Sequence, residues 1–309
     1  MTDSVEQRPA PGGTATLAGR SVARIGYGAM RLVAHGGPGG VAWNGLDDDA
    51  AVALLHRAVE SGVNHIDTAD FYGGGHVNEL LNTALAPYAD VLIATKIGAR
   101  IDPGGSGLVS AQKPAELRAA VEDNVRSLGT DHLPLVYLRR TDIPPGLIAQ
   151  GDQRVPIDDQ LAELIRLRDA GTIGAIGLGN ITAETLRRVA PAGIASVQNC
   201  YSLVDRGDEP VLQACLELGI AWVPYFPLGG AAPGRPQVSA QPTVRQIAAR
   251  LEVGTAAVGL AWLLQHAPNT LLIPGTANFD HLAENLAVGS LHLDEPTMAT
   301  LDTLHPVAS

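Results

Sequence analysis

The chain has 309 residues, of which 46% are hydrophobic and 17% charged, and its formal net charge is −11. This composition supplies a large apolar core and excludes a disordered chain, while the acidic charge argues against nucleic acid and anionic membranes as partners. No secretory signal and no apolar run of about 18 residues is present, so we expect a cytoplasmic protein whose two cysteines, Cys200 and Cys215, are free thiols.

The chain begins with a segment rich in Pro and Gly, residues 1–13, which we expect to be flexible. No linker or internal repeat interrupts the remainder, so residues 14–309 are expected to form one domain. This domain starts with two short runs typical of strands, residues 14–17 and 21–24, separated by Ala-Gly-Arg. The pattern predicts a β-hairpin.

From residue 24 onward, short runs of apolar and β-branched residues alternate with longer segments of helical periodicity. The eight runs predicted as strands are residues 24–28, 64–68, 91–95, 135–138, 174–178, 195–199, 220–225 and 270–274. The helices predicted between them include residues 48–61, 114–128, 158–170 and 255–266. This alternation predicts an α/β fold, a (β/α)8 TIM barrel with an N-terminal β-hairpin; a doubly wound sheet is the alternative.

Polar residues stand where several of these strands end. Asp67, Lys96 and Arg139 close the second, third and fourth strands, and Asn180 follows the fifth. The C-terminal ends of the strands in a parallel barrel meet on one face, where barrel enzymes have their active sites. We therefore expect these four side chains to converge.

Lys96 is informative because Lys96 and Lys113 are the only lysines in the sequence. Burial at a strand end disfavours a charged lysine unless a carboxylate, here Asp67, lies beside it. The resulting positive charge would lower the pKa of the Tyr72 hydroxyl and allow it to give a proton to a carbonyl oxygen. Each residue alone also fits a solvated rim or loop packing, but the combination favours catalysis.

Other motifs with a known chemistry are incomplete or missing. Gly26-Tyr27-Gly28 lacks the third glycine of the dinucleotide-binding fingerprint, and the sequence has neither a Gly-Lys-Ser/Thr triplet nor a Gly-x-Ser-x-Gly elbow. The nine histidines show no metal-ligand spacing. We expect no metal site.

The run Gly-Val-Asn-His-Ile-Asp-Thr-Ala-Asp-Phe-Tyr-Gly at 62–73 resembles the signature of the aldo-keto reductases. Similar blocks follow in the family's order: Ile-Ala-Thr-Lys at 93–96, Val-Gln-Asn at 197–199, Pro-Tyr-Phe-Pro-Leu-Gly at 224–229, Leu-Ile-Pro-Gly-Thr at 272–276 and His-Leu-Ala-Glu-Asn-Leu at 281–286. The resemblance covers about residues 20–305. It implies a barrel enzyme that reduces a small aldehyde or ketone with NADPH.

The resemblance also implies roles for individual residues. Tyr72 would be the proton donor, tuned by Lys96 and Asp67. Asn180 and Gln198 would hold the nicotinamide carboxamide, and Tyr225 would stack on the nicotinamide ring. Taken singly, Gln198 and Tyr225 also fit hydrogen bonding and packing inside the barrel.

The remaining predicted contacts divide into two groups. The further cofactor contacts are Gly28, Ala29, Met30, Phe226, Pro227, Leu228, Gly229, Gly275, Thr276, Asn278, His281, Glu284 and Asn285. Trp43 and Phe71 are the predicted apolar contacts to the substrate.

Arg139 departs from the family pattern, which usually has His at the end of the fourth strand. A bacterial, pyridoxal reductase-like subgroup resembles this chain in ending that strand with Leu-Arg. A guanidinium is always charged and offers several donors, so Arg139 is predicted to stabilise negative charge on the substrate oxygen and to favour ionised Tyr72. The alternative is that Arg139 pairs with Asp142 or faces solvent, a role for which Arg140 is the better candidate.

Two further departures concern the cofactor. His281 stands where many members have Arg, and Gly275 replaces a residue that is frequently basic, so the charge that selects NADPH over NADH is reduced. NADPH rather than NADH is still expected. A Schiff-base lyase that uses Lys96, and a cofactor-binding regulatory subunit without turnover, stay open as other functions. The sequence reveals neither the substrate nor the oligomeric state.

Overall fold

The computed structural model describes residues 9–32, 45–105, 107–230 and 235–304. Parallel strands form one curled sheet in the order β11-β10-β9-β8-β5-β4-β3. Their bounds are β3 Tyr27–Gly28, β4 His65–Asp67, β5 Leu92–Ile97, β8 Leu133–Arg139, β9 Ile173–Gly179, β10 Ile194–Gln198 and β11 Ala221–Trp222.

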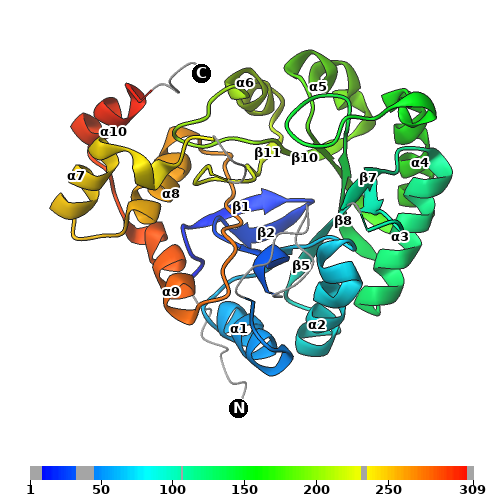
Figure 1. The fold of residues 1–309 in the computed structure, drawn as a ribbon, viewed down its shortest axis with the longest axis horizontal. Coiled ribbons are helices and arrows are strands. Elements are labelled where there is room, and N and C mark those ends of the chain that lie inside the picture. Colours follow the sequence, from blue (N-terminus) through cyan, green and yellow to red (C-terminus); the bar gives the residue numbers. More distant parts are fainter. Residues whose placement is uncertain (1–8, 33–44, 106, 231–234, 305–309) are drawn as a thin grey trace.

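An eighth segment, residues 270–272, closes this sheet into a ring. Thr270 forms a parallel bridge with Trp222 at one edge, and Leu272 forms another with Ile25 beside the other edge. The strands predicted at residues 220–225 and 270–274 are shorter in the structure, because Pro224 and Pro274 have no N–H to continue the hydrogen bonding between strands. The predicted barrel is confirmed (Figure 1).

Helices surround the strands (Figure 1). They are α1 Asp48–Glu60, α2 His76–Leu85, α3 Pro114–Leu128, α4 Ile157–Asp169, α5 Ala183–Val189, α6 Glu209–Leu218, α7 Pro242–Arg250, α8 Thr255–His266, α9 Phe279–Ala287 and α10 Glu295–Asp302. The side chain of Asp47 accepts the N–H of Ala50 and so caps α1. Gly129 ends α3 and Gly219 ends α6, with φ of 61° and 66°, which are left-handed values that glycine adopts without strain.

No single helix within the described residues has the length and apolar composition to cross a membrane. α7 and α8 have the required length and apolar composition only when they are counted as one helix, and the pair is bent by 94°. Most of the α8 side chains are buried against the barrel.

The predicted N-terminal hairpin consists of β1 Thr14–Leu17 and β2 Arg20–Ala23, paired antiparallel. Leu17 and Val22 are buried in one cluster with Leu92, Leu135 and Leu271 of the barrel interior. The hairpin therefore covers the end of the barrel opposite the strand C-termini, at the centre of the view in Figure 1.

The segment expected to be flexible is described only in part. Residues 1–8 lie outside the described residues. Pro11 accepts a hydrogen bond from the N–H of Ile25 (3.1 Å), and Gly13 accepts one from the N–H of Arg24 (2.9 Å). These bonds fix residues 11–13 to the barrel. The domain boundary expected at residue 14 stays a prediction.

Side chains alternate between the barrel interior and the helices. On β5, Leu92 and Ala94 belong to the interior cluster, and Ile93 and Ile97 pack against the surrounding helices. Lys96 continues the inward series at the C-terminal end of the strand. The barrel interior is thus apolar at the hairpin end and polar at the opposite end.

Glycines make room for two large rings inside the barrel. A Cβ at Gly26 would lie 2.3 Å from Nε2 of His65, and a Cβ at Gly177 would lie 2.3 Å from the ring of Tyr137. Both distances are far below van der Waals contact. The centre is therefore packed by side chains rather than open as a pore.

His65 should make stability depend on pH. It is 1% exposed, and neither ring nitrogen has a hydrogen-bond partner among the described residues. Burial lowers the pKa of His65 to about 4. At pH values between the ordinary pKa of histidine and this lowered pKa, the unfolded chain binds a proton that the folded chain does not. The free energy of unfolding should therefore decrease by about 3 kcal/mol as the pH falls through this range.

Denaturant titrations across this pH range test the assignment. The variant His65→Leu keeps an apolar side chain in the space but removes the titrating group, so its stability should depend less on pH than that of the wild type. Parallel losses of stability in the two proteins would show that His65 is not responsible.

Candidate functional site

The C-terminal ends of the strands bring the predicted polar residues to one end of the barrel. Asp67 ends β4, Arg139 ends β8 and Gln198 ends β10, and Lys96 is the last residue but one of β5. Gly179 on β9 pairs with Arg139 of β8 on one side and with Gln198 of β10 on the other. The convergence expected from the barrel therefore occurs.

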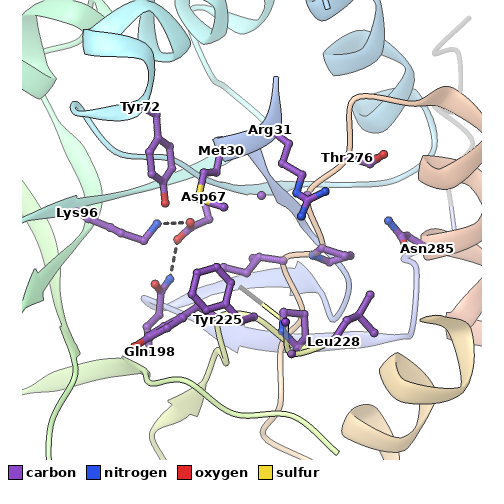
Figure 2. A pocket seen from close by; sticks show the side chains of 18 of the residues that line it. Met30, Arg31, Asp67, Tyr72, Lys96, Gln198, Tyr225, Leu228, Thr276 and Asn285 are labelled. Carbon is purple, nitrogen blue, oxygen red and sulfur yellow. Dashed lines mark hydrogen bonds and ion pairs between the residues drawn. The ribbon is translucent and has the colours of Figure 1, made fainter. Parts of the chain in front are cut away.

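These side chains line a cavity of about 450 Å³ (Figure 2). Of the residues predicted for catalysis, cofactor and substrate, those that line it are Gly28, Met30, Asp67, Phe71, Tyr72, Lys96, Arg139, Asn180, Gln198, Tyr225, Phe226, Pro227, Leu228, Gly229, Gly275, Thr276, His281, Glu284 and Asn285. Their individual roles stay predictions.

Three predicted contacts do not line the cavity or are not described. Ala29 is fully buried away from it. The side chain of Asn278 accepts the N–H of His281 (2.9 Å) and caps α9, and its predicted contact with the cofactor stays a prediction. Trp43 lies outside the described residues.

The cavity also has lining residues that the sequence did not single out. They are Arg31, Tyr137, Gly230 and Ala256. Gly179, which the sequence places at the end of the fifth strand, and Ile273 and Pro274 of the family block at 272–276 line it as well. Alternation along β8 could have identified Tyr137, since it stands two residues before Arg139. Arg31, the residue after Met30, could have been noticed as a cation beside a predicted cofactor contact. Ala256 comes from α8, and no local pattern indicates that this helix reaches the cavity.

A buried ion pair stands at the inner end of the cavity. The Lys96 ammonium pairs with the Asp67 carboxylate and also donates to the Thr68 carbonyl (3.0 Å). Lys96 is 9% exposed and Asp67 is 4% exposed. Burial alone would lower the pKa of Lys96, but the charges of Asp67 and Tyr72 raise it above its ordinary value. Lys96 therefore stays charged.

Tyr72 lies directly beside this pair (Figure 2). It begins the short helical turn Tyr72–Gly75 that follows β4, and Nζ of Lys96 is 5.2 Å from the centre of its ring. Burial raises the pKa of Tyr72, and the Lys96 charge lowers it as the sequence predicted, but the effect of burial is larger, so the pKa lies above its ordinary value. Tyr72 is consequently protonated at neutral pH and has a proton to give.

Hydrogen bonds from deeper in the barrel orient the ion pair. Nε2 of Gln198 donates to Oδ2 of Asp67 (2.6 Å), as Figure 2 shows. Tyr137 hydrogen-bonds to Ser196 (2.7 Å) below them. Asp67 thus has one oxygen on Lys96 and the other on Gln198, which fixes its orientation.

The next part of the wall combines amides with an aromatic ring. The hydroxyl of Tyr225 donates to Oδ1 of Asn180 (2.7 Å), while Nδ2 of Asn180 donates to the Arg140 carbonyl (3.1 Å). Asn180 has a φ of 56°, a left-handed value that asparagine tolerates better than most residues. Together with Gln198, these groups offer amide hydrogen bonds and a flat ring, a combination that fits a nicotinamide carboxamide and its ring.

Arg139 and Arg140, which stand at the end of β8, have different environments. Arg140 pairs with Asp142 (2.6 Å) and donates to Gln160. The alternative in which Arg139 pairs with Asp142 is therefore wrong. Arg139 lines the cavity instead.

The family model described as "Aldo/keto reductase family" matches residues 24–306. The chain belongs to the aldo/keto reductase family. This membership makes it an oxidoreductase and agrees with the polar cluster at the strand ends.

Individual relatives match over almost the whole chain. It is 43% identical over 295 residues to pyridoxine 4-dehydrogenase of Escherichia coli (strain K12), which covers 94% of this chain and 97% of that protein. An uncharacterized oxidoreductase of Schizosaccharomyces pombe is 34% identical over 292 residues, covering 94% and 89%. The solved aldo-keto reductase of Klebsiella pneumoniae in complex with NADPH has a TM-score of 0.75, 25% identity and 95% coverage of both chains.

The two lysines of this reductase allow a matched test of the ion pair. Lys96→Met leaves the Asp67 carboxylate buried without its counter-charge, so we expect a loss of about 3–5 kcal/mol in the free energy of unfolding. Lys113 pairs with Asp152 at the surface, where their side chains are 41% and 77% exposed. Lys113→Met should change the free energy of unfolding far less than Lys96→Met does, because water screens the exposed pair.

A double-mutant cycle completes this test. Asp67→Asn combined with Lys96→Met removes both charges and should cost less than the sum of the single substitutions. Additive losses in urea denaturation would mean that the two groups do not stabilise each other.

Proposed function

We propose that this reductase transfers hydride from NADPH to an aldehyde or ketone, with Tyr72 as the proton donor, and that it catalyses the reverse oxidation of the alcohol. The observation that carries the proposal is the buried Lys96–Asp67 pair beside the protonated Tyr72, at the inner end of a cavity. A general acid in contact with a fixed cation is suited to protonating a carbonyl oxygen.

The lining of the cavity fits NADPH along its length. Asn180 and Gln198 would hold the carboxamide, and Tyr225 would lie against the nicotinamide ring. Residues 226–229 would lie along the pyrophosphate, with Thr276 and Asn285 near the adenosine at the far end (Figure 2). When bound, NADPH supplies the hydride that reduces the carbonyl carbon. The Klebsiella pneumoniae relative in complex with NADPH supports this choice of cofactor.

The side chains divide the remaining chemistry among them. The Tyr72 hydroxyl gives its proton to the carbonyl oxygen, and the Lys96 ammonium stabilises the phenolate that remains. Asp67 keeps Lys96 charged and in place, and Gln198 fixes Asp67. Arg139 adds positive charge near the oxygen, since its charge lowers the pKa of Tyr72. Burial of Tyr72 and Lys96 keeps water away and strengthens these interactions.

For the substrate, we propose the 4-aldehyde of pyridoxal, or the 4-hydroxymethyl group of pyridoxine in the reverse direction. The support is the 43% identity to an enzyme named for this reaction. A Schiff-base lyase is disfavoured because Lys96 is held in its charged form, without the lone pair that a nucleophile needs. We keep the cytoplasmic location as part of the proposal.

Consumption of NADPH in the presence of pyridoxal tests the function directly. Tyr72→Phe removes the proton donor and should lower kcat by about 10²–10⁴-fold, while the Kd for NADPH stays similar. Tyr88→Phe is a matched control, since the Tyr88 hydroxyl donates to the Leu128 carbonyl and does not line the cavity. Full turnover by Tyr72→Phe would refute the proton-donor role. Binding of NADPH by the wild type without turnover of any carbonyl would favour a regulatory subunit.

Arg31 should contribute to cofactor affinity. It extends into the cavity from the wall opposite Leu228 (Figure 2), and NADPH carries several negative charges. Arg31→Gln should weaken NADPH binding by about 10-fold, as expected for the loss of a charge-assisted hydrogen bond. The exposed Arg100, which does not line the cavity, provides the control Arg100→Gln.

Fluorescence quenching gives Kd for both cofactors in the same experiment. We expect the wild type to bind NADPH more tightly than NADH. Equal affinities would contradict that preference, and an unchanged Kd in Arg31→Gln would contradict the contact.

A further inference from the structure

At the end of the cavity where Tyr72 and Lys96 lie, the positive charge of Arg139 has no counter-charge among the described residues. The Asp67 carboxylate neutralises Lys96, and Asp142 is held by Arg140. The guanidinium of Arg139 has no hydrogen bond or ion pair with any described residue. The other lining carboxylate is that of Glu284, from the helix that carries Asn285 at the far end of the cavity in Figure 2.

Arg139 lines the same cavity as the proton donor Tyr72. Its carbonyl accepts a hydrogen bond from Nε2 of Gln112 (2.9 Å), which fixes the backbone at the strand end. A Cβ at Gly146 would lie 3.0 Å from Nη2, so the guanidinium occupies space that the glycine leaves free. The charge of Arg139 acts on both Tyr72 and Tyr225, which stand on different walls of the cavity. The guanidinium therefore lines the cavity on the side of the loop that carries Gly146, close enough for its charge to act on Tyr72.

We propose that Arg139 binds a second, anionic oxygen on the substrate, attached to the ring carbon next to the one that bears the aldehyde. This inference rests on the proposed function and narrows the substrate class to aromatic aldehydes with an ionised ortho hydroxyl. In such a compound the two oxygens lie close together on one side of the ring. Pyridoxal, with its hydroxyl at position 3 and its aldehyde at position 4, belongs to this class.

The donors at this end of the cavity match two neighbouring oxygens. Tyr72 has a single O–H for the carbonyl oxygen, and the Lys96 ammonium is already held by Asp67 and Thr68. Arg139 offers five N–H donors in a fixed fork, so it can hold the anionic oxygen and still reach the carbonyl oxygen.

Two aldehydes of similar size test the inference. The first is 3-hydroxypyridine-4-carbaldehyde, which carries the ionisable oxygen, and the second is 3-methoxypyridine-4-carbaldehyde, in which that oxygen cannot ionise. The measurement is the ratio of their kcat/KM values with NADPH. Because intrinsic reactivity affects every variant alike, the change in this ratio between proteins isolates the contribution of Arg139.

We expect Arg139→Met to lower the hydroxy-to-methoxy ratio by about 10- to 100-fold, with much of the change in KM. Arg139→Lys, which keeps the charge but loses the fork, should give an intermediate ratio. The exposed control Arg100→Met should leave the ratio unchanged. In the wild type, the ratio should also decrease as pH falls below the pKa of the substrate hydroxyl.

The possible failures are distinguishable. If the wild type reduces neither aldehyde, the proposed function and this inference fail together. If it reduces both, and the ratio responds neither to Arg139 nor to pH, the carbonyl reductase stands and the anionic subsite is refuted.

Discussion

The buried ion pair between Lys96 and Asp67 is the interaction on which the chemistry of this reductase depends. Two charges removed from water are tolerated only when they are close and their remaining hydrogen-bond capacity is used. Here Thr68, which follows β4, and Gln198 use it. The strands β4 and β5 that carry the pair are neighbours, whereas β10, which carries Gln198, is separated from β5 by β8 and β9. The pair therefore fixes the strand ends relative to one another and leaves a permanent cation beside Tyr72.

The packing of the barrel explains how such a pair can be held. Its hairpin end is filled by apolar side chains, including Leu17 and Val22 of the N-terminal hairpin, and its centre by the rings of His65 and Tyr137. Charged groups enter at the last inward positions of the strands, above the hydrogen-bonded pair of Tyr137 and Ser196. The packed interior thereby excludes water from beneath the ion pair.

The adjacent arginines show how one strand end can serve two purposes. Alternation places Arg139 inside the barrel and turns Arg140 outward. Arg140 joins Asp142 and Gln160 and stabilises the loop after β8, whereas Arg139 is left charged within the cavity. A cation without a counter-charge in the protein can direct its full charge at a carbonyl oxygen or at an anionic group of the substrate.

Much of the fold and most of the site could be predicted from local patterns. The alternation of strands and helices, the hairpin, and the polar residues at strand ends follow from periodicity, because a parallel barrel gathers its strand ends on one face. The family block at residues 62–73 added the proton donor, and those at 224–229, 272–276 and 281–286 added most of the cofactor contacts. Asn278, which lies between the last two blocks, was also assigned to the cofactor, and the structure shows that its side chain caps α9.

The sequence by itself thus determined the barrel, its ordered strand ends and the residue types that meet there. Only the tertiary structure decided which partner each charged group has, because ion pairs depend on distances between segments far apart in the chain. It assigned Asp142 to Arg140, brought Gln198 to Asp67, and placed Arg31 on the cavity wall. It also decided whether the pKa of Tyr72 is raised or lowered. Burial raises this pKa and the Lys96 charge lowers it, and the balance between them depends on three-dimensional packing.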